Sequence, residues 1–358
     1  MAEWRWLAQP LLVLPILLLL MLAGCSQRRP PDEPAEPVAP ERAEQPQARP
    51  LPPQSLRLPP ADSRSEYRPL PGAFPRPQAL EPAVGFWRKV YSVWRRSQVA
   101  IHDDRHLDVV YEIFEVPGPV AESLTPEQKD AVASRRNYWT ERLGQLEEKM
   151  NARLPLDADE RLILARFQAD GRRNRLAGAS ERVHSQRGTQ ERFFKGLEIG
   201  SRYDGIYRQI FREAGLPEDL AYLPHVESSF QASARSSAGA VGIWQFTRGA
   251  AERFMTVNAR VDERLDPIAS ARGAARYLSY AYAKLRDWPA AITSYNHGIN
   301  GMMRAQNQMG SNFVRIVQEY DHPNFGFASR NYYAEFLAAS DIARSPERFL
   351  AARQNYGR

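Results

Sequence analysis

The sequence predicts a predominantly α-helical protein. Apolar residues recur at helical spacing from Phe86 to Trp94 and from Val132 to Met150, which is the pattern of a helix with one buried face. The second stretch follows Thr125-Pro126-Glu127-Gln128, which has the form of a capping box with proline at the first helical position. Between them, the segment from Val99 to Val116 is rich in β-branched and aromatic residues, and its pattern leaves strand and helix undecided.

The first 24 residues have the composition of a signal peptide. Leu11 to Leu22 is almost wholly apolar, but it is interrupted by Pro15 and is too short to span a bilayer comfortably. The run ends in Leu22-Ala23-Gly24-Cys25, which resembles the lipobox of bacterial lipoproteins, in which the cysteine is lipidated and becomes the first mature residue. We therefore expect a lipid anchor at Cys25, and Ser26 after it resembles the pattern of outer-membrane lipoproteins. The alternative is an uncleaved membrane anchor, and both place the remaining chain outside the cytoplasm.

A proline-rich tether is expected from residue 25 to residue 85. More than half of the 28 prolines of the chain lie between residues 30 and 82, among Arg, Glu, Gln and Ala. Such a segment buries too little apolar surface to offset the entropy of ordering, so we expect it to be disordered and without a core. In polyproline II conformation it would reach on the order of 100 Å or more, far enough to carry a membrane-anchored domain into a layer beyond the membrane.

A helical N-terminal region is expected from residue 86 to residue 204. Beyond Met150, another helix is expected to start at Asp157 or Asp159. The highly charged segment from Gly171 to Arg187 is expected to be a loop, and Thr189 is expected to cap a further helix. These are signals of a core, and they indicate no chemistry in this region.

Neither a metal site nor a nucleic-acid site is predicted. His102 and His106 are four residues apart in the HDDRH stretch, but a third ligand and the spacing of a zinc protease are missing, so a solvated polar turn is expected there. The net charge of +6 suits an acidic partner such as a cell-wall polymer, a membrane surface or nucleic acid. The arginines are spread along the chain and no nucleic-acid-binding module is visible, so nucleic acid is not an expected partner.

The strongest candidate for chemistry is Glu227. A helical stripe through Ile210 stops at Gly215-Leu216-Pro217, and a new helix is expected from near Glu218, short or kinked because of Pro224. Glu227 follows its apolar face near the end of that helix, where a side chain can point into a cleft. A carboxyl group leaving an apolar element has a raised pKa and can act as a general acid near neutral pH.

Glu227 belongs to the first of four short motifs that occur along the chain. They are Glu227-Ser228, Gly242-Ile243-Trp244-Gln245, Ser294-Tyr295-Asn296 and Asn331-Tyr332. Together they resemble the motifs of the family 1 lytic transglycosylases, and most closely those of the membrane-bound lytic murein transglycosylase D group. The resemblance covers about residues 205 to 340. It departs from the commonest family form at Ile243-Trp244, where Leu-Met is frequent, and at Ser294, where Ala is frequent.

The resemblance implies a goose-type lysozyme-like catalytic domain at residues 205–345, followed by a tail at 346–358. It implies that Glu227 protonates the oxygen between N-acetylmuramic acid and N-acetylglucosamine in peptidoglycan. Glu227 would then take the proton of the muramoyl C6 hydroxyl, closing a 1,6-anhydro ring without water. No metal or organic cofactor is implied.

The resemblance also assigns roles to the residues around the acid. Ser228 and Gln245 would hydrogen-bond the sugar or Glu227. Tyr295 and Asn296 would orient the acid and the glycan, and Tyr332 would line the groove. Trp244 could stack on a sugar ring, with a place in the core as the alternative reading.

Two other functions remain open from the sequence. Glycoside hydrolysis ordinarily uses two carboxylates, and the motif set contains one, which favours ring closure over a lysozyme-type muramidase. Glu218 and Asp219 are expected toward the far end of the same helix, and nothing indicates that Glu252 faces the cleft. A non-catalytic peptidoglycan-binding scaffold is the other alternative.

Overall fold

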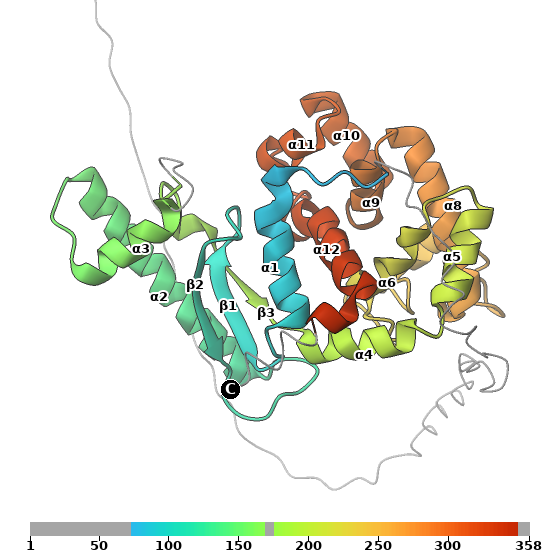
Figure 1. Ribbon diagram of the computed structural model, residues 1–358, viewed down its shortest axis with the longest axis horizontal. Coiled ribbons are helices and arrows are strands. Elements are labelled where there is room, and N and C mark those ends of the chain that lie inside the picture. The colour runs from blue at the N-terminus through green and yellow to red at the C-terminus, as the bar shows by residue number, and fades with distance from the viewer. Residues whose placement is uncertain (1–72, 169–174, 350–358) are drawn as a thin grey trace, which may run out of the picture. The chain divides into compact units, whose positions relative to one another are not determined.

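The computed structural model describes residues 73–168 and 175–349 (Figure 1). The expected signal peptide, the lipidation site Cys25 and most of the expected tether lie outside the described residues. Within the described ranges, no helix combines the length and the apolar character needed to cross a bilayer.

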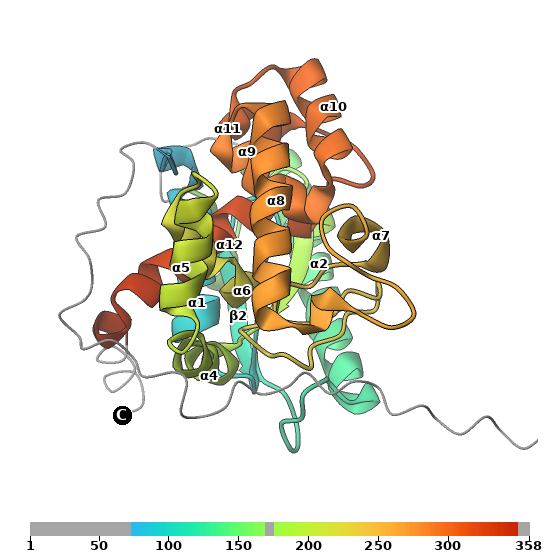
Figure 2. The same cartoon turned by 90° about the vertical axis from the view of Figure 1, so that its right-hand side faces the viewer.

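The second half of the chain is a bundle of helices around one large core, so the prediction of a predominantly α-helical fold is confirmed. Helix α8 packs against α5 and α9, and α12 packs against α9 and α6 (Figures 1 and 2). The elements are α5 (Asp204–Glu213), η4 (Glu218–Tyr222), α6 (Leu223–Glu227), α7 (Arg248–Ala251), η5 (Glu263–Leu265), α8 (Pro267–Leu285), α9 (Trp288–His297), α10 (Ile299–Met309), α11 (Phe313–Glu319) and α12 (Phe327–Arg344).

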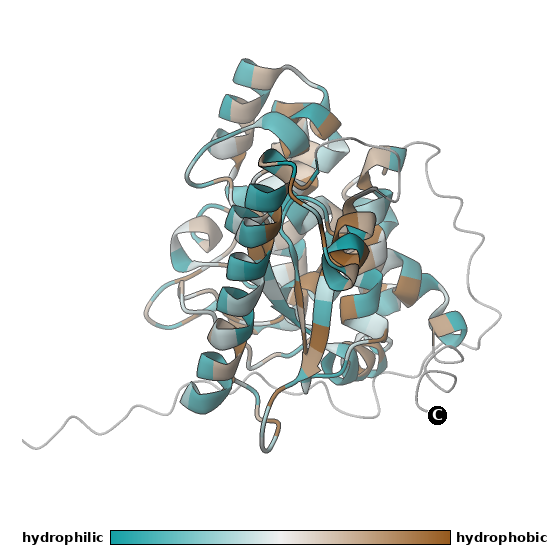
Figure 3. Ribbon diagram, turned by 90° about the vertical axis from the view of Figure 1, so that its left-hand side faces the viewer, coloured by the Kyte–Doolittle hydropathy of each residue, from teal (hydrophilic) through white to brown (hydrophobic). Residues whose placement is uncertain are grey.

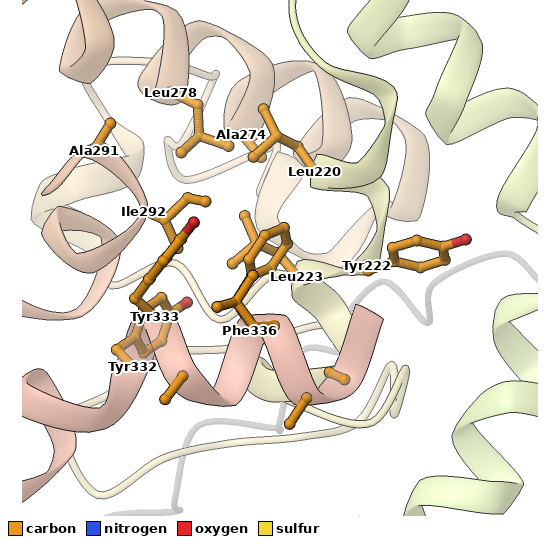
Figure 4. Packing of buried hydrophobic residues seen from close by; sticks show 14 of the residues in the cluster. Leu220, Tyr222, Leu223, Ala274, Leu278, Ala291, Ile292, Tyr332, Tyr333 and Phe336 are labelled. Carbon is orange, nitrogen blue, oxygen red and sulfur yellow. The ribbon is translucent and has the colours of Figure 1, made fainter. Parts of the chain in front are cut away.

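Figure 4 shows how the core joins four of these elements. Leu220 and Leu223 lie between Leu278 of α8 and Phe336 of α12, and all four side chains are buried. Burying an aliphatic or aromatic side chain of this size contributes about 1.5–3 kcal/mol. The short segment that ends in Glu227 is therefore held by its apolar residues, and little by its own helical hydrogen bonds.

Several helix starts follow the signals in the sequence. Thr125 and Gln128 form both hydrogen bonds of a capping box at the start of α2 (Pro126–Asn151), as predicted. Asp266 accepts hydrogen bonds from two backbone amides at the start of α8, where proline stands at the first helical position. Thr189 does not cap α4 (Gln190–Gly200) with its side chain, contrary to prediction. Its hydroxyl donates to the Val90 carbonyl instead, which ties α4 to the end of α1 (Glu81–Ser92).

The region from 86 to 204 is not wholly helical. It contains a three-stranded antiparallel sheet in the order β2-β1-β3, formed by β1 (Gln98–Asp103), β2 (Val110–Glu115) and β3 (Val183–Arg187). The undecided segment from Val99 to Val116 is thus a hairpin. The expectation of a loop up to Arg187 was wrong for β3, because an edge strand with mostly half-buried polar side chains has no apolar alternation to reveal it.

Helices α2 and α3 (Ala158–Gln168) form a second, smaller core with this sheet. Trp139, Leu143 and Leu146 of α2 are buried against it, whereas most other side chains of α2 are exposed and hydrophilic (Figure 3). Helices α1 and α4 take no part in this second core: they contribute Val90, Tyr91 and Phe193 to the large one. The boundary expected at residue 204 therefore does not coincide with the boundary between the two cores.

His102 is a buried strand residue, and the prediction of a solvated polar turn was wrong for it. Its ring lies 4.6 Å from that of Phe86 and 5.6 Å from that of Phe327, both measured between centroids. Burial lowers the pKa of His102 to about 4, so the imidazole is neutral near pH 7. Among the described residues, no three His, Cys, Asp or Glu side chains gather as metal ligands would.

Helix α4 lies directly against the segment that follows Glu227. A Cβ atom on Gly196 would stand 2.7 Å from the Ser229 carbonyl oxygen, and one on Gly200 would stand 2.9 Å from the Phe230 ring. Real Cβ atoms do not approach backbone or ring atoms so closely. Glycine at these two positions therefore permits the close approach of α4.

Replacing Gly196 with alanine tests this contact. We expect G196A to lower the free energy of unfolding by about 1–3 kcal/mol, because the added methyl group must push α4 away from Ser229. The matched control is G205A in α5, where nothing lies within 4 Å of an added Cβ. That variant should be neutral or up to about 1 kcal/mol more stable, since alanine favours a helix over glycine. Equal effects of the two variants in urea unfolding would contradict this packing.

Candidate active site

Glu227 is the last residue of α6, a helix of 5 residues with Pro224 in its first turn. The chain then leaves the helix abruptly, because Ser229 and Phe230 both have positive φ, at 50° and 58°. That backbone region is uncommon for residues other than glycine, and its cost must be offset by the surroundings. Here the Phe230 ring is buried and its backbone N–H donates to the Pro224 carbonyl. The turn after Glu227 is thus stabilised by core packing.

The Glu227 carboxyl group is half-buried and has no cationic partner among the described residues. Burial raises its pKa to about 7, although the Tyr332 hydroxyl, which donates to Oε1, opposes the rise. His225, two residues earlier, supplies no positive charge, because burial lowers its pKa to about 3. Near neutral pH, Glu227 therefore exists partly as a neutral acid with a proton to transfer.

Two tyrosines place the acid and the turn beside it. Tyr332 of α12 is buried and contacts Glu227 directly. Tyr295 of α9 donates instead to the Trp244 carbonyl, at 2.9 Å, and its ring lies edge-on to Phe246. The structure thus brings Tyr332 to the carboxyl group, while Tyr295 acts on the Gly242–Gln245 turn.

The Gly242–Gln245 turn is tied to the Glu227 segment by side-chain hydrogen bonds. Ser228 is buried, and its Oγ donates to the Ile243 carbonyl at 2.8 Å. Gln245 donates through Nε2 to the carbonyls of Gly242 and Ala234, at 2.7 and 3.1 Å. The Ser228 side chain therefore bonds to the turn, and among the described residues it makes no hydrogen bond to the Glu227 carboxyl group. The half-buried Gln245 keeps its Oε1 without a hydrogen-bond partner among the described residues.

Trp244 is a core residue, so its assignment as a substrate-binding residue was wrong. Its exposed fraction is 0%, and its ring lies 5.2 Å from Tyr207 and 5.8 Å from Phe211, between centroids. A sugar can stack only on a ring face that solvent reaches. Trp244 instead fills the space between the turn and α5.

Asn296 lies at the exposed end of α9, and its one side-chain hydrogen bond among the described residues is not to Glu227. Its Oδ1 accepts a hydrogen bond from Ser329 Oγ at 2.7 Å, which joins the end of α9 to the start of α12. The structure therefore brings together Glu227 and Tyr332 directly and links Ser228, Gln245 and Tyr295 to them through the turn. Asn296 stands apart at the α9–α12 junction.

The sequence motifs missed a second acidic group, Glu335 of α12. Its Oε2 accepts a hydrogen bond from the Tyr91 hydroxyl of α1 at 3.0 Å. Burial, with a contribution from the charge of Glu227, raises the pKa of Glu335 to about 8. Glu335 follows Tyr332 by three residues, so helical spacing alone puts both on one face. Tyr91 could not have been found this way, since it precedes Glu335 by 244 positions.

Residues 209–314 match the family model of the transglycosylase SLT domain. The chain therefore carries an SLT domain, and the expected lysozyme-like helical fold is confirmed for this part. Tyr332, Glu335 and Tyr91 all lie outside the matched residues, although they contact the site.

Two curated relatives are named as lytic transglycosylases, and a third has a different name. A membrane-bound lytic murein transglycosylase D of Escherichia coli (strain K12) is 28% identical over 141 residues, which cover 38% of this chain and 30% of the relative. A membrane-bound lytic murein transglycosylase F 2 of Alkalilimnicola ehrlichii is 28% identical over 166 residues, 43% of this chain and 36% of the relative. A protein of Alteromonas sp. (strain M-1) named for tributyltin chloride resistance is 38% identical over 92 residues, 25% of this chain and 44% of the relative.

The chain therefore carries an SLT domain and, over part of its length, is similar to membrane-bound lytic murein transglycosylases. In each case the aligned part spans less than half of the relative's own length.

Replacing Trp244 separates a core role from a sugar-stacking role. W244A should lower the free energy of unfolding by about 3–5 kcal/mol, because it leaves a cavity beside Tyr207 and Phe211. W244F keeps an aromatic ring in the same place and should lose markedly less stability. Urea unfolding measures both. A W244A protein of unchanged stability that binds glycan more weakly would restore the sugar-stacking assignment.

Proposed function

We propose that this protein is a peptidoglycan lytic transglycosylase. It would cleave the β-1,4 bond between N-acetylmuramic acid and N-acetylglucosamine and leave a 1,6-anhydro end on the muramoyl residue. The observation that carries the proposal is the carboxyl group of Glu227, which lies within the SLT match, accepts a hydrogen bond from Tyr332 and has a pKa raised to about 7. The names of the D and F relatives support the substrate.

In the first step Glu227 acts as a general acid. Because Tyr332 donates to Oε1, the proton for transfer is carried by Oε2. That proton passes to the glycosidic oxygen as its bond to muramoyl C1 breaks, and the N-acetylglucosamine end leaves as a neutral hydroxyl. The Tyr332 hydroxyl then stabilises the carboxylate that remains, which is why this hydrogen bond lowers the pKa.

In the second step the Glu227 carboxylate acts as a general base. It removes the proton of the muramoyl C6 hydroxyl while the oxygen bonds to C1, so that the sugar closes on itself. No water is consumed, and the acid form of Glu227 is restored. One group serves both steps because its pKa lies near neutral pH, where acid and base forms are both populated.

The rival reaction is hydrolysis, and Glu335 is the observation that favours it. A glycoside hydrolase usually has two carboxyl groups beside the glycosidic bond that it cleaves. A base must be ionised, however, and the pKa of Glu335 is raised to about 8, so the group is mostly protonated at neutral pH. We therefore assign it no part as a base, and ring closure remains the better account.

Substrate contacts are proposed for two amide side chains, those of Gln245 and Asn296. Gln245 offers its free Oε1 to the N–H of an acetamido group, and the exposed Asn296 amide lies at the end of α9. Ser228 and Tyr295 support the turn that holds Gln245.

The proposed location is the periplasmic side of the outer membrane. A lipid on Cys25 would anchor the chain, and residues 25–85 would let the catalytic part reach the cell-wall glycan strands. The lipobox-like sequence supports this anchor, and two relatives are named as membrane-bound.

Mass spectrometry of digested cell-wall sacculi tests the reaction. The wild-type protein should release fragments with an anhydro end, one water lighter than the hydrolytic product. E227Q, which keeps the size of the side chain but has no transferable proton, should cleave at least about 100-fold more slowly.

The matched control is E319Q, which changes an exposed glutamate paired with Arg315 on α11 and should cleave normally. Reducing ends in the wild-type digest would establish a muramidase. Cleavage by E227Q at the native rate would exclude Glu227 as the acid.

A further inference from the structure

Glu335 and Tyr91 form a side-chain pair beside the catalytic acid that the two-step mechanism leaves unused. Glu335 lies on α12 one turn after Tyr332, the residue that contacts Glu227. Tyr91 reaches it from α1, and the two helices pack along each other (Figure 1). The site thus draws its polar side chains from three helices: Glu227 from α6, Tyr332 and Glu335 from α12, and Tyr91 from α1.

Packing fixes the pair in this place. The Tyr91 ring stacks on Phe193 of α4 at 4.7 Å between centroids, and Phe193 in turn stacks on His225 of α6 at 5.1 Å. These three stacked rings join α1, α4 and α6. The stack therefore fixes the position of α6, which bears Glu227, relative to α1, which bears Tyr91. Gly196 brings α4 close enough for this stack.

The surroundings of the two carboxyl groups contain no compensating positive charge. From α6 come Glu227 and His225, from α9 Tyr295, from α1 Tyr91, and from α12 itself Tyr332. His225 is neutral, because burial lowers its pKa to about 3. No lysine or arginine among the described residues pairs with either glutamate. Each carboxyl group is therefore exposed to the charge of the other.

We propose that Glu335, held by the Tyr91 hydroxyl, is a positioning residue that couples its own ionisation to that of Glu227 and so keeps a proton in the active site at neutral and mildly alkaline pH. The proposal rests on the assignment of Glu227 as the catalytic acid. It makes α1, which lies outside the SLT match, a part of the catalytic apparatus.

The two carboxyl groups ionise one after the other. With pKa values of about 7 for Glu227 and about 8 for Glu335, Glu227 loses its proton first, and its negative charge opposes the ionisation of Glu335. The interaction is reciprocal, so an ionised Glu335 must also hold the proton on Glu227. Above about pH 7 the pair therefore retains acid that an isolated Glu227 would have lost.

Carboxyl-carbon NMR titration of the full mature protein measures the coupling without any substrate. Wild-type protein should show two glutamate carboxyl signals with a raised pKa. The signal missing in E227Q belongs to Glu227, and the signal missing in E335Q belongs to Glu335. In E227Q the pKa of Glu335 should fall, because a like charge has gone. In E335Q the midpoint for Glu227 should change little, but the part of its titration that extends above pH 7 should move to lower pH, because the ionised Glu335 that held the proton there has gone.

Two further variants test whether the Tyr91 hydrogen bond acts on Glu335. Y91F keeps the ring stacked on Phe193 but removes the donor, and because the Tyr91 hydrogen bond lowers the pKa of Glu335, that pKa should rise further in Y91F. E319Q on α11 should leave both titrations unchanged. Far-ultraviolet circular dichroism of each variant checks that it is folded.

The pH profile of cleavage gives the second readout. In E335Q the alkaline limb of kcat/KM should move to lower pH by about half a unit, with the rate at pH 6 within about threefold of wild type. The proposal would be overturned if the titration of Glu335 were the same in E227Q as in wild type and the titration of Glu227 were the same in E335Q as in wild type. So would an E335Q protein that is inactive at every pH while Glu227 titrates normally, since Glu335 would then be a reacting group. If no anhydro product forms at all, the proposed function fails, and the NMR titrations still decide the coupling.

Discussion

The contact between the Tyr332 hydroxyl and the Glu227 carboxyl is the interaction on which the site depends. It joins two residues separated by 105 positions, one at the end of a short helix and the other on a long one. Neither α6 nor the turn after it would keep its shape alone, because a helix of 5 residues has few internal hydrogen bonds and because Ser229 and Phe230 have positive φ. The core around Leu223 and Phe336 supplies the stability that these local features lack.

Burial explains both the position and the chemistry of the acid. The apolar residues that fix α6 also remove Glu227 from part of the surrounding water, and this desolvation favours the neutral carboxyl group. A hydroxyl partner stabilises the ionised form only in part, so the group can lose and regain a proton near neutral pH. An arginine or lysine in place of Tyr332 would hold the carboxylate permanently ionised and remove its use as an acid.

The helices before the SLT domain belong to the same core as the residues around Glu227, the proposed acid. Tyr91 and Phe193 place α1 and α4 against α12 and α6, while the small sheet and α2 form a core of their own. The region from 86 to 204 therefore has two roles. Its ends belong to the large core that surrounds Glu227, and its middle forms the second, smaller core.

The sequence predicts best those features that depend on residues close together in the chain. The capping box at Thr125, the glycine stop at Gly215 and the four ordered motifs are local patterns, so several helices and the candidate site at Glu227 were predicted from them. The strand β3 and the pair of Glu335 with Tyr91 depend on partners far away in the chain, and no local pattern encodes such partners. Trp244 was misassigned because a tryptophan between a glycine turn and a glutamine looks the same whether its ring faces a groove or the core.

The pH dependence of stability tests the central claim, that burial keeps a proton on Glu227, most directly. Its pKa is about 7 in the folded protein and near 4.5 when unfolded, so between these values the folded state binds more protons and loses stability as the pH rises. Glutamine cannot ionise, so E227Q should be more stable than wild type by about 2–3 kcal/mol at pH 8, and this gain should disappear toward pH 4.5. A difference in urea unfolding free energy that stays constant from pH 4.5 to pH 8 would contradict the account.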